Sequence, residues 1–420
     1  MTPAHATHFA TANPHALATI LEASQTKRII ASRDIFDLQG IKLWARDLPV
    51  SEALQRKLLD RKLRQPLESC LLAEDGVTAH SLVQATAALI ERDTPLAVLL
   101  RPCADKIVRE AAHLPLHSVA QLLLTAGQAT RPESFDHAVQ AMALNGALMI
   151  HQGGATQELR LAMLSGLLHD LGEMYIAPQY TEADADRALD LQSYQQLVVH
   201  PHVGHLLLAQ LTDYPALIAR AVAEHHERLD GSGYPHGLLR DQVSPLGRLL
   251  CVTEATLAVL RGPHPQLARA SVALRVVPGE FDLAWVGRIA RAAHSQPALR
   301  ADRGPHEIQT RLTALDAALQ AAQDCATALM GSAESLALKD ALGLSQHLLA
   351  KLRTGWNTSG LWSEQAVAAQ DAAEVEAIED ELHFRLRSIQ RAALLRAGKV
   401  PPTDMRRLNL LCDQLIARAQ

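Results

Sequence analysis

Aromatic residues and cysteines are scarce in this chain. Only 3% of the 420 residues are Phe, Trp or Tyr, whereas 48% are hydrophobic, so most of the apolar content is aliphatic. The five cysteines, at positions 70, 103, 251, 325 and 412, are odd in number and lack CxxC spacing. This pattern excludes a disulfide-rich scaffold and indicates the reducing environment of the cytoplasm.

Long hydrophobic runs and an excess of basic charge are also missing. No apolar stretch approaches the roughly 18 residues of a membrane-spanning helix, and the first residues, MTPAHATHFATANPHA, lack a basic region followed by an apolar core. The formal net charge of −5 disfavours a DNA-binding protein, which normally has a basic surface. We therefore expect a cytoplasmic protein that binds neither membranes nor DNA.

Runs rich in Ala and Leu predict a mainly α-helical protein, with apolar residues at intervals of three and four through most of the chain. One exception is residues 27–50, where two stretches rich in Ile, Val, Phe and Trp flank LQG and predict a small β hairpin. Near the C-terminus, GWNTSGLW at 355–362 is expected to interrupt the long amphipathic helices. Its Trp356 and Trp362 are core anchors or contact residues.

The length predicts two to three domains. We expect a flexible segment at 1–26, an accessory or regulatory region at 27–130, a central domain at 131–298 and a helical extension at 299–420. The accessory region is either a sensory or docking module or a plain scaffold. The extension is either a dimerisation or partner surface or a helical cap on the central domain.

Histidines concentrate in one part of the chain. Nine of the 20 lie between His137 and His236, about twice an even share. Several occur in the strings SGLLHDLGE (165–173), LVVHPHVGH (197–205) and HHERLDGSGYP (225–235). A neutral imidazole offers one nitrogen to a metal, and a carboxylate can bridge two cations. The strings therefore predict a metal site.

On HDLG and HHERLDGSGYP, with their spacing, the chain resembles the HD-GYP domain of the HD phosphohydrolase superfamily over about residues 130–290. The resemblance implies an all-helical domain at 131–298 with two divalent metal ions, iron or manganese. It implies hydrolysis of cyclic di-GMP to linear pGpG or GMP, with a bridging water activated by both metals. A GGDEF-domain protein and a second copy of the chain are the expected protein partners.

The same resemblance implies the metal ligands. One ion would be held by His137, His169, Asp170 and Glu254, and the other by Asp170, His200, His225 and His226. Asp170 bridges both, and Asp170 and Glu173 are the candidate catalytic residues. Glu133 matches a third-metal ligand, four residues before His137 on one helix face; it is equally an exposed glutamate favoured by the helix dipole.

Three positions depart from the family pattern. Glu254 stands where the family has Asp, and Leu257 replaces a second Asp, which weakens the case for a third metal. Glu173 replaces a Lys that can meet a substrate phosphate, so it marks altered substrate choice, an extra metal ligand or lost activity. Arg261, which follows the last expected ligand, is either a substitute for the basic residues that the family has there or a solvated side chain.

The segment after the histidine pair matches the signature loop of the family, which is associated with substrate and with GGDEF domains. Two of its glycines permit backbone conformations that other residues avoid. The arginine and the aspartate either contact substrate or hold the loop. The matching residues are Arg228, Asp230, Gly231, Gly233, Tyr234 and Pro235.

These observations leave three hypotheses. The first is a metal-dependent phosphodiesterase of cyclic di-GMP or a related cyclic dinucleotide. The second, motivated by Glu173, Glu254 and Leu257, is a catalytically diverged module that binds nucleotide or protein and signals through its flanking helices. The third is an HD-type hydrolase of another phosphorylated nucleotide.

Overall fold

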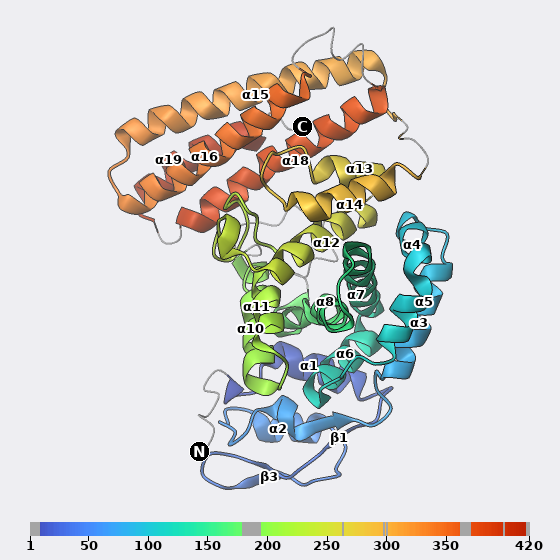
Figure 1. The fold of residues 1–420 in the computed structure, drawn as a ribbon. Helices are drawn as coiled ribbons and strands as arrows, with labels where there is room; N and C mark the ends of the chain where they lie inside the picture. The colour runs from blue at the N-terminus through green and yellow to red at the C-terminus, as the bar shows by residue number, and fades with distance from the viewer. Residues whose placement is uncertain are drawn as a thin grey trace. The chain divides into compact units, whose positions relative to one another are not determined.

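The computed structural model describes residues 9–178, 195–262, 264–296, 299, 301–361, 371–397 and 400–416. These residues are mainly helical, which confirms the predicted fold class (Figure 1). They form two compact units. The first comprises the described parts of 1–189, 196–226 and 244–253, and the second those of 190–195, 227–243 and 254–420. No helix among the described residues is long and apolar enough to cross a membrane.

The first unit begins with a helix where the sequence suggested a flexible segment. Helix α1 (Pro14–Ala23) is capped by Asn13, whose side chain accepts hydrogen bonds from the backbone nitrogens of His15 and Ala16. Ile20 is fully buried, and α1 packs on α6 (Ser118–Thr130). The expectation of flexibility is therefore corrected for residues 14–23, because a cap and a buried apolar face offset the ordering entropy.

Two small antiparallel strand pairs follow. Strands β2 (Ile35–Phe36) and β3 (Lys42–Trp44) form the predicted hairpin around LQG, where Gly40 has a φ of 81°. Strand β1 (Ile29–Ala31) pairs instead with β4 (Leu71–Ala73), which lies much later in the chain. The local turn residues predicted the first pairing, whereas the second depends on a contact between distant segments.

Short helices complete the part of the first unit that precedes the histidine-rich strings. They are amphipathic, and they bury leucine, isoleucine and alanine side chains. These elements are α2 (Glu52–Leu58), η2 (Leu67–Cys70), α3 (Ala79–Glu91), α4 (Pro95–Leu100), η3 (Arg101–Cys103) and α5 (Ala104–Ala111).

The histidine-rich strings lie on a second set of helices. Helices α7 and α8 pack on each other, as do α10 and α11. The bounds are α7 (Pro132–Gln152), α8 (Thr156–Leu168), η4 (Leu171–Tyr175), α10 (His200–Leu211), α11 (Ala216–Glu224) and α12 (Pro245–Arg261). Helix α12 is continuous, but its residues up to Thr253 belong to the first unit and the rest to the second.

A buried asparagine fastens three of these helices together. Asn145, in the apolar run of α7, donates from Nδ2 to the carbonyl oxygen of Ala162 on α8 at 2.9 Å. Its Oδ1 accepts a hydrogen bond from the hydroxyl of Thr253 on α12. Because a buried amide is costly unless it is hydrogen-bonded, these contacts fix the positions of the three helices relative to one another.

The second unit contains the long C-terminal helices, and Figure 1 shows α15, α16, α18 and α19 running alongside one another. Trp356 is only 2% exposed, which makes it a core anchor, whereas Trp362 lies outside the described residues. Helix α16 runs through Ser359, so the predicted interruption at 355–362 is wrong for its first five residues. The bounds are η7 (Arg240–Gln242), α13 (Leu267–Ala273), α14 (Leu283–Ala293), α15 (Pro305–Ser332), α16 (Leu336–Ser359), α18 (Ala372–Ala397) and α19 (Pro402–Ile416).

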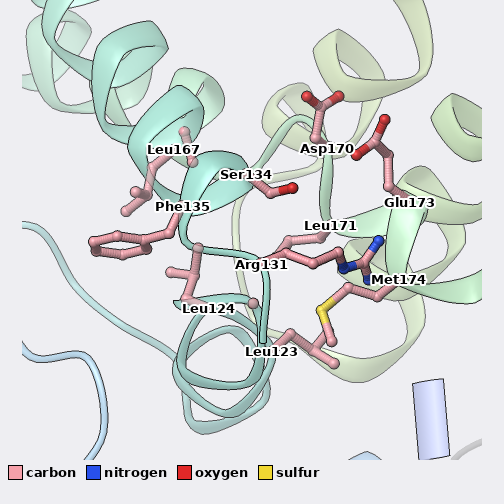
Figure 2. Close-up of a pocket in the computed structure, with 12 residues that line it drawn as sticks. Leu123, Leu124, Arg131, Ser134, Phe135, Leu167, Asp170, Leu171, Glu173 and Met174 are labelled. Atoms are coloured by element: carbon pink, nitrogen blue, oxygen red, sulfur yellow. The ribbon is translucent and has the colours of Figure 1, made fainter. Parts of the chain in front are cut away.

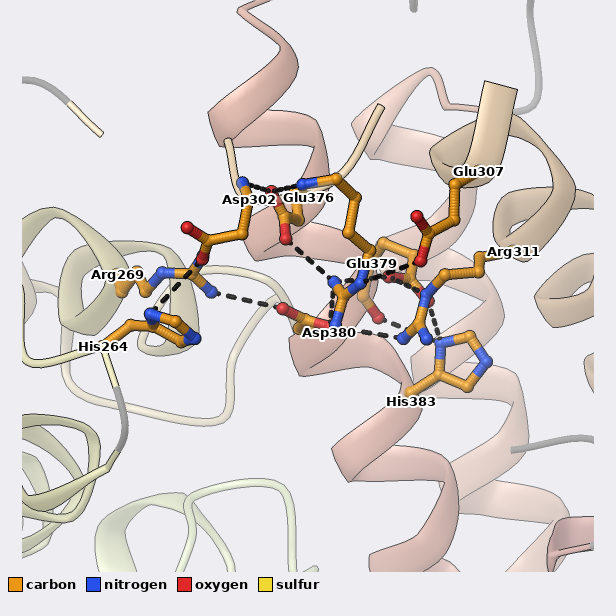
Figure 3. Close-up of polar contacts among 10 residues, drawn as sticks. His264, Arg269, Asp302, Glu307, Arg311, Glu376, Glu379, Asp380 and His383 are labelled. Atoms are coloured by element: carbon orange, nitrogen blue, oxygen red, sulfur yellow. Dashed lines mark hydrogen bonds and ion pairs between the residues drawn. The ribbon is translucent and has the colours of Figure 1, made fainter. Parts of the chain in front are cut away.

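Charged side chains link α18 to the start of α15 within this unit (Figure 3). The Nη1 atom of Arg303 lies 2.8 Å from Oδ1 of Asp380, and Nε of Arg311 lies 2.9 Å from Oε2 of Glu379. The carboxylate of Glu379 is fully buried and also faces Nδ1 of His383 at 2.5 Å. Burial alone would raise the pKa of the Glu379 carboxyl, but the hydrogen bonds from His383 and Arg311 outweigh it and lower the pKa.

Replacement of Glu379 by Gln is expected to destabilise the protein by about 1–3 kcal/mol at pH 7, because Arg311 and His383 lose their buried anion. A lowered pKa stabilises the fold above the unfolded value of 4.5, and this contribution disappears as the pH falls through the lower folded value. Urea denaturation should therefore show a difference between wild type and Glu379→Gln that shrinks below pH 4.5.

The matched control is Asp340→Asn, which breaks the ion pair between Asp340 and Arg396. Both side chains of this pair are about half exposed, so the change should alter stability by no more than about 0.5 kcal/mol. Equal effects of the two substitutions at pH 7 would contradict the importance assigned to the buried network.

Candidate metal centre

The packing of α7 on α8 brings two of the predicted ligands together. His137 lies near the start of α7, and His169 is the residue that follows α8. In a helical hairpin the start of the first helix lies beside the end of the second. The Nε2 atoms of His137 and His169 are accordingly 3.2 Å apart, and both residues are buried.

Helices α10 and α11 repeat this arrangement. His200 is the first residue of α10, and His225 directly follows α11. Their Nε2 atoms are 3.0 Å apart. His226 is buried next to them, with its ring centroid 5.1 Å from that of His200. Two helix pairs thus supply two pairs of close imidazoles and a fifth imidazole.

Asp170 lies between the two pairs. Its Oδ2 atom is 3.0 Å from Nε2 of His169 and 3.3 Å from Nε2 of His137. Its Oδ1 atom is 3.4 Å from Nε2 of His225 and 3.6 Å from Nε2 of His200. Each carboxylate oxygen therefore faces a different pair of histidines, which is the arrangement of a bridging ligand.

Backbone carbonyl groups orient three of these rings. In each case Nδ1 lies within hydrogen-bond distance of the carbonyl oxygen three residues earlier, at 2.6 or 2.7 Å. A carbonyl oxygen can only accept, so Nδ1 carries the proton and the lone pair of Nε2 points toward Asp170. The three pairs are His169 with Gly166, His200 with Leu197, and His225 with Val222.

Burial and neighbouring charges set the ionisation of the cluster. Burial, reinforced by the charge of His226, lowers the pKa of His225 to about 3. Burial alone would raise the pKa of Asp170. When the neighbouring imidazoles take up a second proton, the charge of His169 and the hydrogen bonds from His137, His169 and His200 hold the pKa of Asp170 well below its usual value. Near neutral pH, His225 is therefore neutral and Asp170 is ionised, which is the state in which both bind metals.

The cluster fits divalent metal ions. Lone pairs of neutral imidazoles that face one another and a carboxylate at 3.0–3.6 Å repel unless a cation lies between them. The first group of potential ligands is Asp170, His200, His225 and His226, and His137 and His169 approach the other oxygen of Asp170. Imidazole and carboxylate together suit borderline first-row metals.

Three further positions bear on the predicted ligand set. Glu254 is buried in the second unit, one residue beyond Thr253 on α12, and it pairs with Arg261 at 2.7 Å. Arg261 is exposed to solvent, as one of the two predictions had it, and its guanidinium pairs with the carboxylate of Glu254. Leu257 is fully buried. Glu133 is exposed in the first turn of α7 and belongs to neither group of potential ligands, so its metal role stays a prediction.

A pocket adjoins the cluster in the first unit (Figure 2). Asp170 and the buried Glu173 form part of its lining, so the structure brings the two candidate catalytic carboxylates to one cavity. Arg131 and Ser134 also line it. From the sequence alone, Arg131 was placed only at the start of the central domain, 131–298. The missed signal was an arginine six residues before His137, directly ahead of a proline that starts the same helix.

The signature loop belongs to the second unit, where its arginine and aspartate are structural. Nε of Arg228 lies 3.6 Å from Oε1 of Glu280, and its guanidinium stacks over Phe281. Asp230 accepts hydrogen bonds from the backbone nitrogen and the hydroxyl of Ser232. These contacts support the interpretation that both residues hold the loop.

The backbone of this loop is also specialised. Gly231 has a φ of 84°, and the peptide bond between Tyr234 and Pro235 is cis. Gly233 does not have a positive φ, so the conformational freedom expected of both glycines is used at Gly231. A role of this loop in binding substrate stays a prediction.

The middle of the chain is similar to a known protein family. Residues 116–277 match the family described as HD domain. The chain is 26% identical over 241 residues to a cyclic di-GMP phosphodiesterase of Pseudomonas aeruginosa. The matched region covers 56% of this chain and 55% of that protein. No solved structure matches.

Two further relatives are also named as phosphodiesterases of cyclic dinucleotides. The chain is 24% identical over 227 residues to a 3'3'-cGAMP-specific phosphodiesterase of Vibrio cholerae, with 51% of this chain and 48% of that protein covered. It is 28% identical over 109 residues to a cyclic di-GMP phosphodiesterase response regulator of Xanthomonas campestris, with 26% and 28% covered. The chain thus spans about half the length of the first two relatives.

Proposed function

We propose that this protein is a metal-dependent phosphodiesterase of cyclic dinucleotides, because residues 116–277 match the HD domain family and the chain resembles the HD-GYP domain. The observation that carries the proposal is the carboxylate of Asp170, whose two oxygens each face a separate pair of histidines. This arrangement matches the donor set that a two-metal hydrolase requires.

Each residue of the cluster has a role in this proposal. His137 and His169 would hold one ion and His200, His225 and His226 the other, with Asp170 shared and Glu254 completing the first site. Metals bound there would polarise the phosphodiester and activate a water. The backbone carbonyls behind His169, His200 and His225 keep Nε2 directed toward Asp170. We propose iron or manganese as the metal.

Cyclic di-GMP and 3'3'-cGAMP are the substrates that the relatives suggest. A catalytically diverged module that binds nucleotide without turnover is the second candidate, and the buried carboxylate of Glu173 in the pocket favours it because a carboxylate repels phosphate. We further propose a cytoplasmic location, a GGDEF-domain partner, a homodimer and a phosphohydrolase domain that spans residues 131–298.

The test is to load the full chain anaerobically with Fe(II) or Mn(II) and to follow each cyclic dinucleotide by chromatography. Appearance of the linear dinucleotide or of mononucleotides only in the metal-loaded sample supports the phosphodiesterase. Tight nucleotide binding without product, with both metals confirmed by elemental analysis, would instead support the binding module.

Two histidines of α10 offer a matched comparison. His200→Ala is expected to weaken metal binding by more than the roughly 10–100-fold that follows loss of an outer-shell partner, because a ligand itself is removed. His202→Ala is the control, since His202 is exposed and belongs to neither group of potential ligands. Metal content after dialysis should fall only in His200→Ala; equal retention in both variants would contradict the assignment of His200.

A further inference from the structure

Arg131 has a buried charged group without a partner. Its Nη1 and Nη2 atoms are both buried, and neither forms a hydrogen bond in the structure described here. Within the described residues, Arg131 also forms no ion pair with an acidic side chain. A guanidinium carries five donors in a fixed planar arrangement, and leaving them unsatisfied away from water is costly.

The backbone holds this side chain in place. Arg131 links α6 to α7: its backbone nitrogen donates to the carbonyl oxygen of Gly127 at 2.7 Å, and its carbonyl oxygen accepts from the backbone nitrogen of Ser134 at 3.0 Å. Figure 2 shows the guanidinium extending across the pocket to the side where Glu173 and Met174 lie. The cation is thus positioned before any ligand arrives.

The surroundings of Arg131 indicate what it binds. Among the described residues that line the pocket, it is the only basic one, and Asp170 of the metal cluster lines the same pocket. Leu123, Leu171 and Met174 supply apolar walls that keep water away from the guanidinium. The hydroxyl of Ser134 on the first turn of α7 is a further donor in the lining.

We propose that Arg131, assisted by Ser134, forms an anion-binding subsite that holds a phosphate group of the nucleotide beside the metal cluster. That this anion belongs to a nucleotide rests on the proposed function. A planar guanidinium binds phosphate oxygens through two parallel hydrogen bonds. The subsite also accounts for Glu173, because Arg131 supplies from another element the positive charge that this position lacks.

The experiment compares the manganese-loaded full chain of wild type with Arg131→Ala and Arg131→Gln. Binding of inorganic phosphate is measured by calorimetry, and kcat and KM are measured with cyclic di-GMP. Arg64→Ala is the control, because it removes the same charge from an exposed position of the first unit. Metal content and circular dichroism establish that each variant is folded and loaded; Arg131→Gln keeps a long polar side chain if Arg131→Ala does not fold.

We expect phosphate binding to weaken about 10–100-fold in both Arg131 variants, with KM rising more than kcat falls and Arg64→Ala unchanged. Phosphate affinity equal to that of wild type, or no phosphate binding by wild type, would overturn the subsite. If wild type hydrolyses no cyclic dinucleotide but loses phosphate on replacement of Arg131, the proposed function fails and the subsite stands. If wild type and both Arg131 variants hydrolyse cyclic di-GMP equally well, the proposed function stands and the subsite fails.

Discussion

The Asp170→Asn variant is expected to lose cyclic dinucleotide hydrolysis by at least about 10²–10³-fold. Both carboxylate oxygens of Asp170 face histidine pairs, at 3.0–3.3 Å on one side and 3.4–3.6 Å on the other. An amide keeps the shape, but it loses the negative charge and replaces one oxygen with a nitrogen that cannot bind a metal. Occupancy of both metal sites should fall together with turnover.

The measurement pairs elemental analysis with the chromatographic assay. Asp213→Asn is the matched control, because Asp213 is an exposed aspartate of the same unit outside the potential ligand groups, and it should keep both metals and full turnover. Undiminished hydrolysis by Asp170→Asn would show that the bridging assignment is wrong. Loss of turnover with both metals retained would place the role of Asp170 in the reaction and not in metal binding.

Gly172→Ala is expected to destabilise the protein by about 3 kcal/mol and to reduce metal binding as well. A Cβ atom at Gly172 would lie 2.0 Å from the carbonyl oxygen of His200 and 2.8 Å from the backbone nitrogen of Gly204. The obstacle is backbone, so no side-chain rotation relieves it. Either η4 or the start of α10 must move, and the start of α10 carries His200.

Thermal and urea unfolding, with and without Mn(II), test this prediction. Gly127→Ala is the control, because a Cβ there meets nothing within 4 Å and an alanine favours helix α6 over glycine by up to about 1 kcal/mol. Stability should therefore hold or rise in the control and fall in Gly172→Ala. A wild-type melting temperature and metal content in Gly172→Ala would show that η4 and α10 separate at little cost.

The candidate metal ligands were accessible from the sequence because ligand chemistry depends on residue type. Only a few side chains bind metals, and the strings HDLG and HHERLDGSGYP place them at recognisable intervals. Arg131 was not accessible in this way. An arginine before a proline is common at a helix start, and the burial of its guanidinium depends on how α6, α7 and η4 pack.

The sequence by itself determined the helical class, the β2–β3 hairpin and the set of candidate metal ligands, because periodicity, turn residues and donor chemistry act locally. Only the tertiary structure decided that β1 pairs with β4, that Glu133 is exposed and that the two oxygens of Asp170 face different histidine pairs. These features depend on contacts between segments distant in the chain. Packing energy selects such contacts, and residue spacing does not encode them.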